Sequence, residues 1–351
     1  MDIETRMELI LKDPTEEVIT QQELRELLET KEKISAYDGF EPSGFAHLGS
    51  GLLRAIKLED LIKAKIDFKL LIADWYAWIN NKLGGDMEKI KLAGKYLVEV
   101  WKACGVDTKK VEIIWFSDFV SDPEYWKKVI QIAKITTVKR IIRCSPIMGR
   151  KEAELNYAAQ LFYPAMQAAD PFHLNIDICQ LGMDQRHATM LSREVAEKLG
   201  FPKPVCVHHH LLLGLQAGKR MGKEDFEVKM SKSKPLSAIF VHDTYEQIKE
   251  KIKKAFCPPT AENNPILEIV RFILFRKFDS MEIKTKHGSE SFSCYADLEK
   301  AYIEGKIHPL DLKEAVAEKL NEILTPIREH FEKNKKAKEL YETVKSFEIT
   351  R

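Results

Sequence analysis

The chain has 351 residues, of which 44% are hydrophobic and 31% are charged, and its formal net charge is +1. This balance predicts a globular protein with room for a sizeable core and two domains, and it excludes a disordered or fibrous chain. No apolar run approaches the ~18 residues of a membrane span, and the first residues lack the basic and apolar regions of a secretory signal. The six cysteines are scattered without a C-x-x-C pair, so we expect buried thiols in a cytoplasmic protein rather than disulfides or a zinc site.

Residues 1–33 predict an N-terminal helical segment, because Leu24, Leu27 and Leu28 recur at helical spacing. From residue 34 onward, short apolar runs alternate with amphipathic helical patterns. The predicted strands are 34–39, 68–73, 111–116, 174–180 and 204–208, with helices between them. Such alternation is typical of a Rossmann-like parallel sheet in an α/β domain, which binds ligands at the carboxyl ends of its strands.

Residues 117–170 interrupt this alternation and predict a helical insertion. The insertion contains a basic stretch, 127–151, with eight Lys/Arg and no acidic residue, and a second stretch, 203–235, has seven Lys/Arg against three acids. Two basic patches on a nearly neutral protein suit the phosphate backbone of a nucleic acid, although a solvated helix face has the same pattern. The pattern from 244 to 351 is helical, so we predict a Rossmann-like domain over 34–243 and a separate α-helical domain after it.

The first candidate for a ligand site is the turn after the first predicted strand. Residues 42–44, P-S-G, lead into a helix that opens near His47, and the unpaired amides of a helix N-terminus favour a bound phosphate. Glycines in such a turn are common for structural reasons alone, so this signal is weak by itself. A second stretch, residues 229–233 (K-M-S-K-S), follows about 180 residues later in a polar loop over 214–235. Its two lysines add cations that suit a phosphate-bearing ligand.

These two stretches resemble the signature motifs of class I aminoacyl-tRNA synthetases. Residues 42–50, P-S-G-F-A-H-L-G-S, resemble the HIGH region, and residues 229–233 match the KMSKS loop letter for letter. Ser50 stands where the HIGH motif has its second histidine, which removes an imidazole but leaves a hydroxyl that can donate. Three more segments resemble tyrosyl-tRNA synthetases of the archaeal and eukaryotic type: 36–44, 163–170 and 182–186.

The resemblance implies a ligase that activates L-tyrosine with ATP to tyrosyl-adenylate and pyrophosphate, and then transfers tyrosyl to the 3′ end of tRNA(Tyr). The amino-acid carboxylate attacks the α-phosphorus, so the protein has to align the reactants and stabilise phosphate charge. His47, Lys229 and Lys232 are the predicted catalytic residues. The implied ATP-binding residues are Gly39, Pro42, His47, Gly49, Ser50, Asp184, Lys229, Met230, Ser231, Lys232 and Ser233. Mg²⁺ is expected with ATP, and no protein-held metal site is predicted.

The resemblance also implies a tyrosine pocket, in which Tyr37 and Asp170 hold the phenolic hydroxyl. A carboxylate and a phenol complement a hydroxyl, which both donates and accepts. The implied contacts to the amino end of tyrosine are Tyr163, Gln167 and Gln185. Without the family pattern, the better interpretation of Asp170 is a helix cap before Pro171.

For tRNA(Tyr), the resemblance assigns Arg143 and Arg186 to the first base pair of the acceptor stem. It assigns the turn with His308, Asp311 and Lys313 to the anticodon, and the insertion to a homodimer interface. Residues 208–210, H-H-H, are interpreted as non-metal, because three consecutive side chains cannot all face one ion.

Two alternatives stay open. A tryptophanyl-tRNA synthetase shares the fold and both ATP motifs, but its indole substrate only donates, so the pair Tyr37 and Asp170 argues against it. A non-catalytic tRNA-binding paralogue would not need His47, Lys229 and Lys232.

Overall fold

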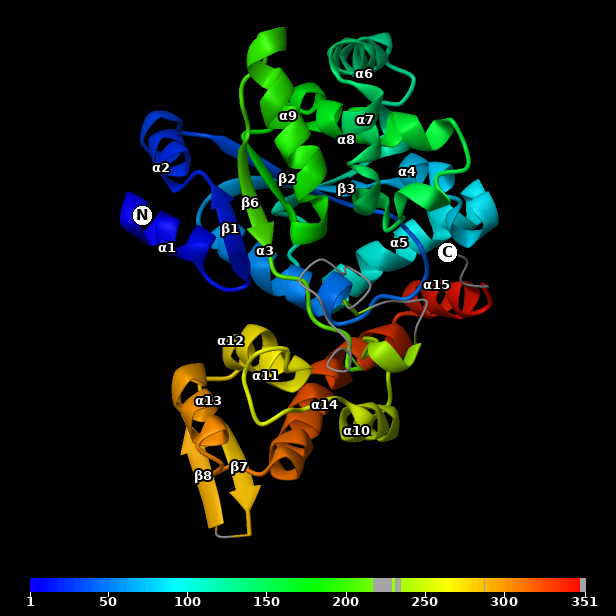
Figure 1. Cartoon of the computed structure of the whole chain (residues 1–351). Coiled ribbons are helices and arrows are strands. Elements are labelled where there is room, and N and C mark those ends of the chain that lie inside the picture. The colour runs from blue at the N-terminus through cyan, green and yellow to red at the C-terminus, as the bar shows by residue number, and fades with distance from the viewer. Residues whose placement is uncertain (217–228, 231–234, 287, 348–351) are drawn as a thin grey trace.

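The computed structural model describes residues 1–216, 229–230, 235–286 and 288–347 (Figure 1). Most of the predicted loop over 214–235 therefore lies outside the described residues. Within the described part, none of the helices combines the length and the apolar character that a membrane span requires. The six cysteines are free thiols, of which four are buried as predicted, whereas Cys257 is partly buried and Cys294 is exposed.

One sheet of six strands organises the first part of the chain, in the order β1-β6-β5-β2-β3-β4. The strands are β1 (Thr15–Ile19), β2 (Ile34–Phe40), β3 (Ile66–Ile72), β4 (Val111–Trp115), β5 (Ile178–Gly182) and β6 (Val205–His209). Strands β2 to β6 run parallel, and the chain leaves β2 towards β3 and β4 on one side before it returns to β5 and β6 on the other. The predicted Rossmann-like fold is confirmed, with its topological switch point between β2 and β5.

Helices cover both faces of this sheet, because successive strand residues point to opposite sides and both sides are apolar. Helices α3 (Arg54–Lys63), α4 (Asp74–Ile79) and α5 (Met87–Ala103) follow β2 and β3 in the chain. The predicted insertion holds α6 (Pro123–Ile135), α7 (Val138–Ile142) and α8 (Ala159–His173), and α9 (Arg186–Leu199) follows β5. In Figure 1, α6, α8 and α9 lie above the sheet and α3 and α5 lie below it. One buried cluster fills each side of the sheet.

The prediction that residues 1–33 are helical is wrong in its middle. Helices α1 (Ile3–Leu11) and α2 (Gln21–Thr30) form as expected, but β1 lies between them and pairs antiparallel with β6. The strand is held by a partner about 190 residues away, with Glu16 bonded to His210 and Glu17 to His208. This long-range pairing overrides a local pattern that, taken alone, continues as a helix.

The described residues of the C-terminal part are mostly helical. Its helices are α10 (Tyr245–Lys254), α11 (Pro265–Ile269), α12 (Phe275–Lys277), α13 (Tyr295–Ile303), α14 (Pro309–Lys333) and α15 (Lys335–Lys345). The predicted α-helical domain also contains a hairpin of β7 (Met281–Thr285) and β8 (Gly288–Phe292), at the lower tip in Figure 1. Met281 and Ile283 are buried while Glu282 and Lys284 are exposed, so period-2 burial selects the strand.

The last helix returns to the first part of the molecule. Helix α15 packs against α5, and the Tyr341 ring stacks on Phe45, with ring centroids 5.5 Å apart. The same ring lies 4.1 Å from the imidazole of His242, whose Nε2 is 2.9 Å from the Tyr96 hydroxyl. The C-terminal helix therefore contacts the loop that leads to His47.

Candidate functional site

The HIGH-like segment follows β2 and differs locally from the prediction of a helix that opens near His47. Residues Gly49–Leu53 form one turn of π-helix, and the regular helix α3 begins at Arg54. The His47 amide donates to Ser50 Oγ at 3.2 Å, and the Gly49 amide donates to His47 Nδ1 at 3.1 Å. Ser50 therefore holds a backbone amide of the turn, and the neutral His47 ring carries its proton on Nε2. Single π-turns are frequent at functional sites.

Backbone hydrogen bonds join the HIGH-like segment to the chain that follows the KMSKS stretch. The Leu48 amide donates to the Ile239 carbonyl at 2.9 Å, and the Val241 amide donates to the Ala46 carbonyl at 3.1 Å. Met230 is held in the same way, since its amide donates to the Leu212 carbonyl at 3.0 Å. The turn at His47 is thus fixed to the chain that follows the KMSKS stretch.

A cavity of 1280 Å³ lies at the carboxyl ends of β2 and β5, as expected for this fold. It brings together these predicted residues: Tyr37, Gly39, His47, Gly49, Ser50, Arg143, Tyr163, Gln167, Asp170, Asp184, Gln185, Lys229 and Met230. Pro42 is buried and does not line it, and Ser231, Lys232 and Ser233 lie outside the described residues. Arg186, His308, Asp311 and Lys313 do not line it either.

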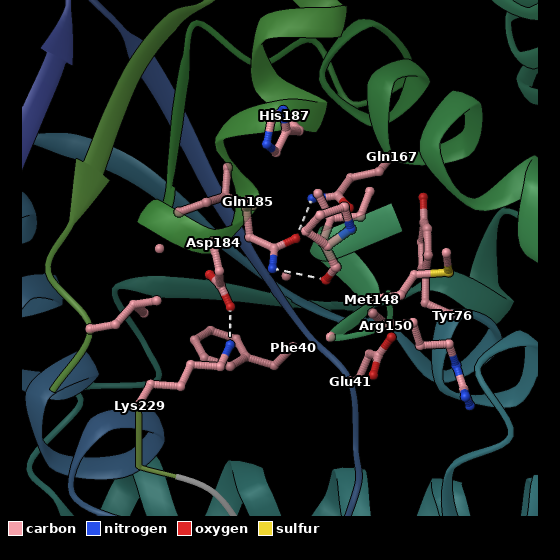
Figure 2. A pocket seen from close by; sticks show the side chains of 18 of the residues that line it. Phe40, Glu41, Tyr76, Met148, Arg150, Gln167, Asp184, Gln185, His187 and Lys229 are labelled. Atoms are coloured by element: carbon pink, nitrogen blue, oxygen red, sulfur yellow. Dashed lines mark hydrogen bonds and ion pairs between the residues drawn. The ribbon is translucent and has the colours of Figure 1, made fainter. Parts of the chain in front are cut away.

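At one end of the cavity, Lys229 Nζ donates to the Asp184 carboxylate (Figure 2). Asp184 follows β5 directly, in the short helical turn Met183–Gln185. A Cβ atom on Gly182 would lie only 2.7 Å from Asp184 Oδ1, so glycine at this position lets the carboxylate approach the strand. This end therefore combines a carboxylate, a lysine and the His47 turn.

At the other end, Asp170 is buried and lies inside α8 rather than at its cap. Its carboxylate accepts hydrogen bonds from the Tyr76 hydroxyl at 2.8 Å and from the Tyr125 hydroxyl at 3.0 Å. Burial raises the pKa of Asp170 to about 8, although both hydrogen bonds lower it. Tyr37 lines the same end, and burial, together with nearby Cys179 and Asp170, raises the pKa of its hydroxyl well above the usual range.

Between these ends, the polar side chains form pairs that cross the cavity. Gln167 Nε2 donates to Gln185 Oε1 at 3.0 Å, as Figure 2 shows. The Tyr163 hydroxyl donates to Glu41 Oε1 at 2.7 Å, and Asn80 Nδ2 donates to the same carboxylate at 3.1 Å. The Glu41 carboxylate, which also lies 3.7 Å from Lys82 Nζ, is therefore held in place beside the predicted contacts to an amino group.

Sequence reasoning missed three functional candidates: Glu41 and Tyr76, which line the cavity, and Tyr125, which does not line it but donates to Asp170. Glu41 lies within the segment that carries the family resemblance, and Tyr76 follows the carboxyl end of β3, so their positions gave a usable signal. Tyr125 lies in α6 within the insertion and had none, because only the packing of α6 against α8 brings it to Asp170.

The residues predicted to contact tRNA have varied surroundings. Arg143 is exposed at the cavity, whereas Arg186 is half-exposed and its Nε lies 2.8 Å from Glu17 Oε2. His308 caps α14 by accepting from the Leu310 amide, and Asp311 lies in the first turn of that helix. Lys313 Nζ donates to the carbonyls of Lys253 and Ala255 and so ties α14 to the end of α10.

Across the described residues, no group of three or more His, Cys, Asp or Glu side chains is arranged to hold a metal ion. The three consecutive histidines have separate partners. His208 lies between Glu17 and Thr189, His209 contacts Gln180, and His210 lies between Glu16 and Glu268.

The profile of the family described as "tRNA synthetases class I (W and Y)" matches residues 29–325. The chain therefore belongs to the class I tRNA synthetases of the tryptophan and tyrosine group.

Full-length relatives within that family are tyrosine–tRNA ligases. One, from Saccharolobus solfataricus, is 49% identical, and the match covers 100% of this chain and 99% of the relative. The crystal structure of tyrosyl-tRNA synthetase with L-tyrosine from Pyrococcus horikoshii is 43% identical, with a TM-score of 0.90 over 98% of this chain and 100% of that one. The tyrosyl-tRNA synthetase structure from Aeropyrum pernix is 41% identical, with a TM-score of 0.89 over 98% of this chain and 99% of that one. The predicted membership among tyrosyl-tRNA synthetases is confirmed.

Proposed function

We propose that this chain is a tyrosine–tRNA ligase that forms tyrosyl-adenylate from L-tyrosine and ATP and then transfers tyrosyl to the 3′ end of tRNA(Tyr). One observation carries the proposal. A single cavity is lined at one end by His47 and Lys229 and at the other by a buried carboxylate, Asp170, that is surrounded by phenol hydroxyls. The family and its full-length relatives support the same activity.

In the activation step, the tyrosine carboxylate attacks the α-phosphorus of ATP, an acyl–phosphate bond forms, and pyrophosphate leaves. His47 donates from Nε2, and Lys229 leaves Asp184 to join Lys232 at the triphosphate, so that cations meet the growing charge. The remaining ATP contacts are assigned to Gly39, Pro42, Gly49, Ser50, Met230, Ser231 and Ser233. Mg²⁺ enters as part of the ATP substrate.

Tyrosine lies with its phenol against Tyr37 and Asp170. Its ammonium group lies near Tyr163, Gln167 and Gln185, where the Glu41 carboxylate, 2.7 Å from the Tyr163 hydroxyl, supplies the opposite charge. A site built to bind a hydroxyl rejects phenylalanine, because its buried polar groups would stay unpaired. An indole cannot accept a hydrogen bond, so this pocket does not suit tryptophan.

The tRNA assignments follow the domain organisation. We assign the acceptor stem to Arg143 and Arg186 of the domain over 34–243, and the anticodon to His308, Asp311 and Lys313 of the domain over 244–351. To bind tRNA, Arg186 has to break its ion pair with Glu17 and contact a phosphate or a base instead. Because this ion pair is half-exposed, breaking it costs little free energy.

We assign a homodimer interface to the insertion, because Ile130, Ile135 and Val138 expose 41 to 67% of their surface there. Val129 and Ile132 face inward and are buried. The molar mass in solution tests this assignment, and a protomer mass at micromolar concentration would exclude it. A cytoplasmic location agrees with the free thiols.

The decisive experiment is amino-acid-dependent ATP–pyrophosphate exchange with each of the twenty amino acids, without tRNA. Exchange with tyrosine alone is the expected result. Exchange with tryptophan would keep the reaction but overturn the pocket assignment. A folded protein that binds tRNA and catalyses no exchange would be a non-catalytic paralogue.

A further inference from the structure

A chain of four polar side chains, of which three are buried and His209 is partly buried, lies at the proposed ATP end of the cavity, and the mechanism above does not use it. Asp38, Gln180 and His209 come from the neighbouring strands β2, β5 and β6, and Arg54 comes from α3. Arg54 Nη1 donates to Gln180 Oε1 and lies 3.2 Å from Asp38 Oδ2. Gln180 Nε2 lies 3.0 Å from His209 Nδ1. Arg54 and Gln180 are almost fully buried, so these contacts are shielded from water.

This chain determines which nitrogen of His209 carries the proton. A guanidinium only donates, so Gln180 Oε1 is the acceptor and the Gln180 Nε2 group is the donor. His209 Nδ1 then has to accept, which leaves the ring proton on Nε2. Burial, together with nearby Arg54 and Lys57, lowers the pKa of His209 well below its ordinary range. The ring is therefore neutral and presents an N–H donor at Nε2.

The Nε2 atom lies beside the ATP end of the cavity. His209 lines the cavity, and a Cβ atom placed on Gly182 would lie 3.5 Å from His209 Nε2 and 2.7 Å from Asp184 Oδ1. The imidazole donor of His209 and the carboxylate acceptor of Asp184 thus lie on either side of the space next to Gly182. His209 Nε2 makes no hydrogen bond to any residue that the structure describes. A partly buried N–H group without an acceptor is energetically costly unless a ligand or a water molecule accepts its hydrogen bond.

The chemistry of this pair selects the part of ATP that it suits. A carboxylate beside a neutral donor repels a phosphate, whose proposed partners are the neutral donor His47 and the cation Lys229. A ribose hydroxyl fits, because it donates to Asp184 and accepts from His209 Nε2 at once. We propose that His209 binds a ribose hydroxyl of ATP through Nε2–H, and that Gln180 and Arg54 are positioning residues that hold its ring in the donor tautomer. This inference rests on the proposed placement of ATP.

The test compares His209→Leu with His209→Gln, whose amide keeps a donor near the position of Nε2. Exchange assays with tyrosine should show a KM for ATP raised about 2- to 10-fold in His209→Leu, the range for one neutral hydrogen bond, and restored in His209→Gln. The KM for tyrosine should not change. His208→Gln is the matched control, because that ring faces Glu17 and Thr189, away from the cavity.

Two analogues, 2′-deoxy-ATP and 3′-deoxy-ATP, identify the acceptor. The analogue that lacks the hydroxyl contacted by His209 should bind wild type more weakly than ATP does. The same analogue should bind wild type and His209→Leu with equal affinity. If His209→Leu weakens ATP and both analogues by the same factor, the ribose contact is refuted. Titration calorimetry with the nucleotides gives this comparison even if the protein catalyses no exchange, so failure of the proposed function remains distinguishable.

The positioning role has its own readout. Gln180→Leu should raise the KM for ATP, and the double variant Gln180→Leu/His209→Leu should be no worse than His209→Leu alone. Ring ¹⁵N signals of wild type, assigned by their loss in His209→Gln, should report the Nε2–H tautomer. Additive effects of the two substitutions, or an Nδ1–H tautomer, would overturn the role of Gln180. If His209→Leu does not fold, two other measurements test the proposal. They are the ring tautomer of His209 in wild type and the binding of ATP and the two analogues to His209→Gln.

Discussion

Asp170 is the residue whose replacement tests the tyrosine pocket most directly. Asp170→Asn keeps the volume of the side chain and removes its charge. In the protein the carboxylate already accepts from Tyr76 at 2.8 Å and Tyr125 at 3.0 Å, and a third donor, the substrate hydroxyl, completes the set. Hydrogen bonds to charged groups contribute about 1.5–3 kcal/mol, against about 0.5–1.5 kcal/mol between neutral groups. Above pH 8, where the carboxyl is ionised, the loss for tyrosine is therefore about 1–1.5 kcal/mol, or roughly 5- to 13-fold in kcat/KM.

Phenylalanine has no hydroxyl that could contact Asp170, so its kcat/KM should change little. The ratio of kcat/KM for tyrosine to that for phenylalanine should therefore fall by the same factor.

The pH dependence of tyrosine binding gives a second, independent signature. Burial raises the pKa of Asp170 to about 8, so the carboxyl of the empty site is mostly protonated at pH 7. A substrate hydroxyl that donates to the carboxylate lowers this pKa, so binding releases a proton and tyrosine binds more tightly as the pH rises towards 8.

The assay is pyrophosphate exchange with tyrosine and phenylalanine from pH 6.5 to 9, together with calorimetry in two buffers of different ionisation enthalpy. Wild type should release a proton on binding tyrosine, and Asp170→Asn should not. Phenylalanine is the control for titration of the amino group of the substrate. An unchanged ratio of tyrosine to phenylalanine in Asp170→Asn, with a pH profile that matches wild type, would refute the assignment of Asp170 to the phenol.

Four further variants test the remaining assignments. Burial alone would lower the pKa of His210, but its hydrogen bonds to Glu16 and Glu268 raise it to about 9, so this histidine stabilises the fold fully below pH ~6.5 and loses that effect as the pH rises through 9. His210→Gln should flatten the change in Tm between pH 6 and 9.5, and a slope equal to wild type would contradict this. Lys232→Ala should slow adenylate formation by orders of magnitude with little change in tRNA affinity, and Asp311→Ala should weaken tRNA charging alone; a variant that loses both steps equally has a structural role instead. Tyr341→Ala removes the ring that stacks on the loop before His47 and should raise the KM for ATP several-fold while the KM for tyrosine stays constant, which steady-state exchange measures.

Local chemistry in the sequence is enough to predict the parallel sheet and to single out His47 and Lys229, which line one cavity in the structure. Apolar runs separated by amphipathic helical patterns require strands with helices on both sides, and β2 to β6 form as predicted within a few residues. The residues near His47 and Lys229 carry their signal in short contiguous motifs. Asp170 had no such signal of its own, and only the family resemblance distinguished it from a helix cap.

Contacts between distant parts of the chain decided what the sequence alone could not show. Strand β1 exists because β6 offers an unpaired edge, and the β7–β8 hairpin exists because α14 gives Met281 and Ile283 a surface to bury against. The two phenols at Asp170 come from positions 94 and 45 residues away in the chain. Periodicity and propensity describe a residue by its neighbours in sequence, whereas these side chains acquire their roles from partners that only the packed tertiary structure brings within hydrogen-bonding distance.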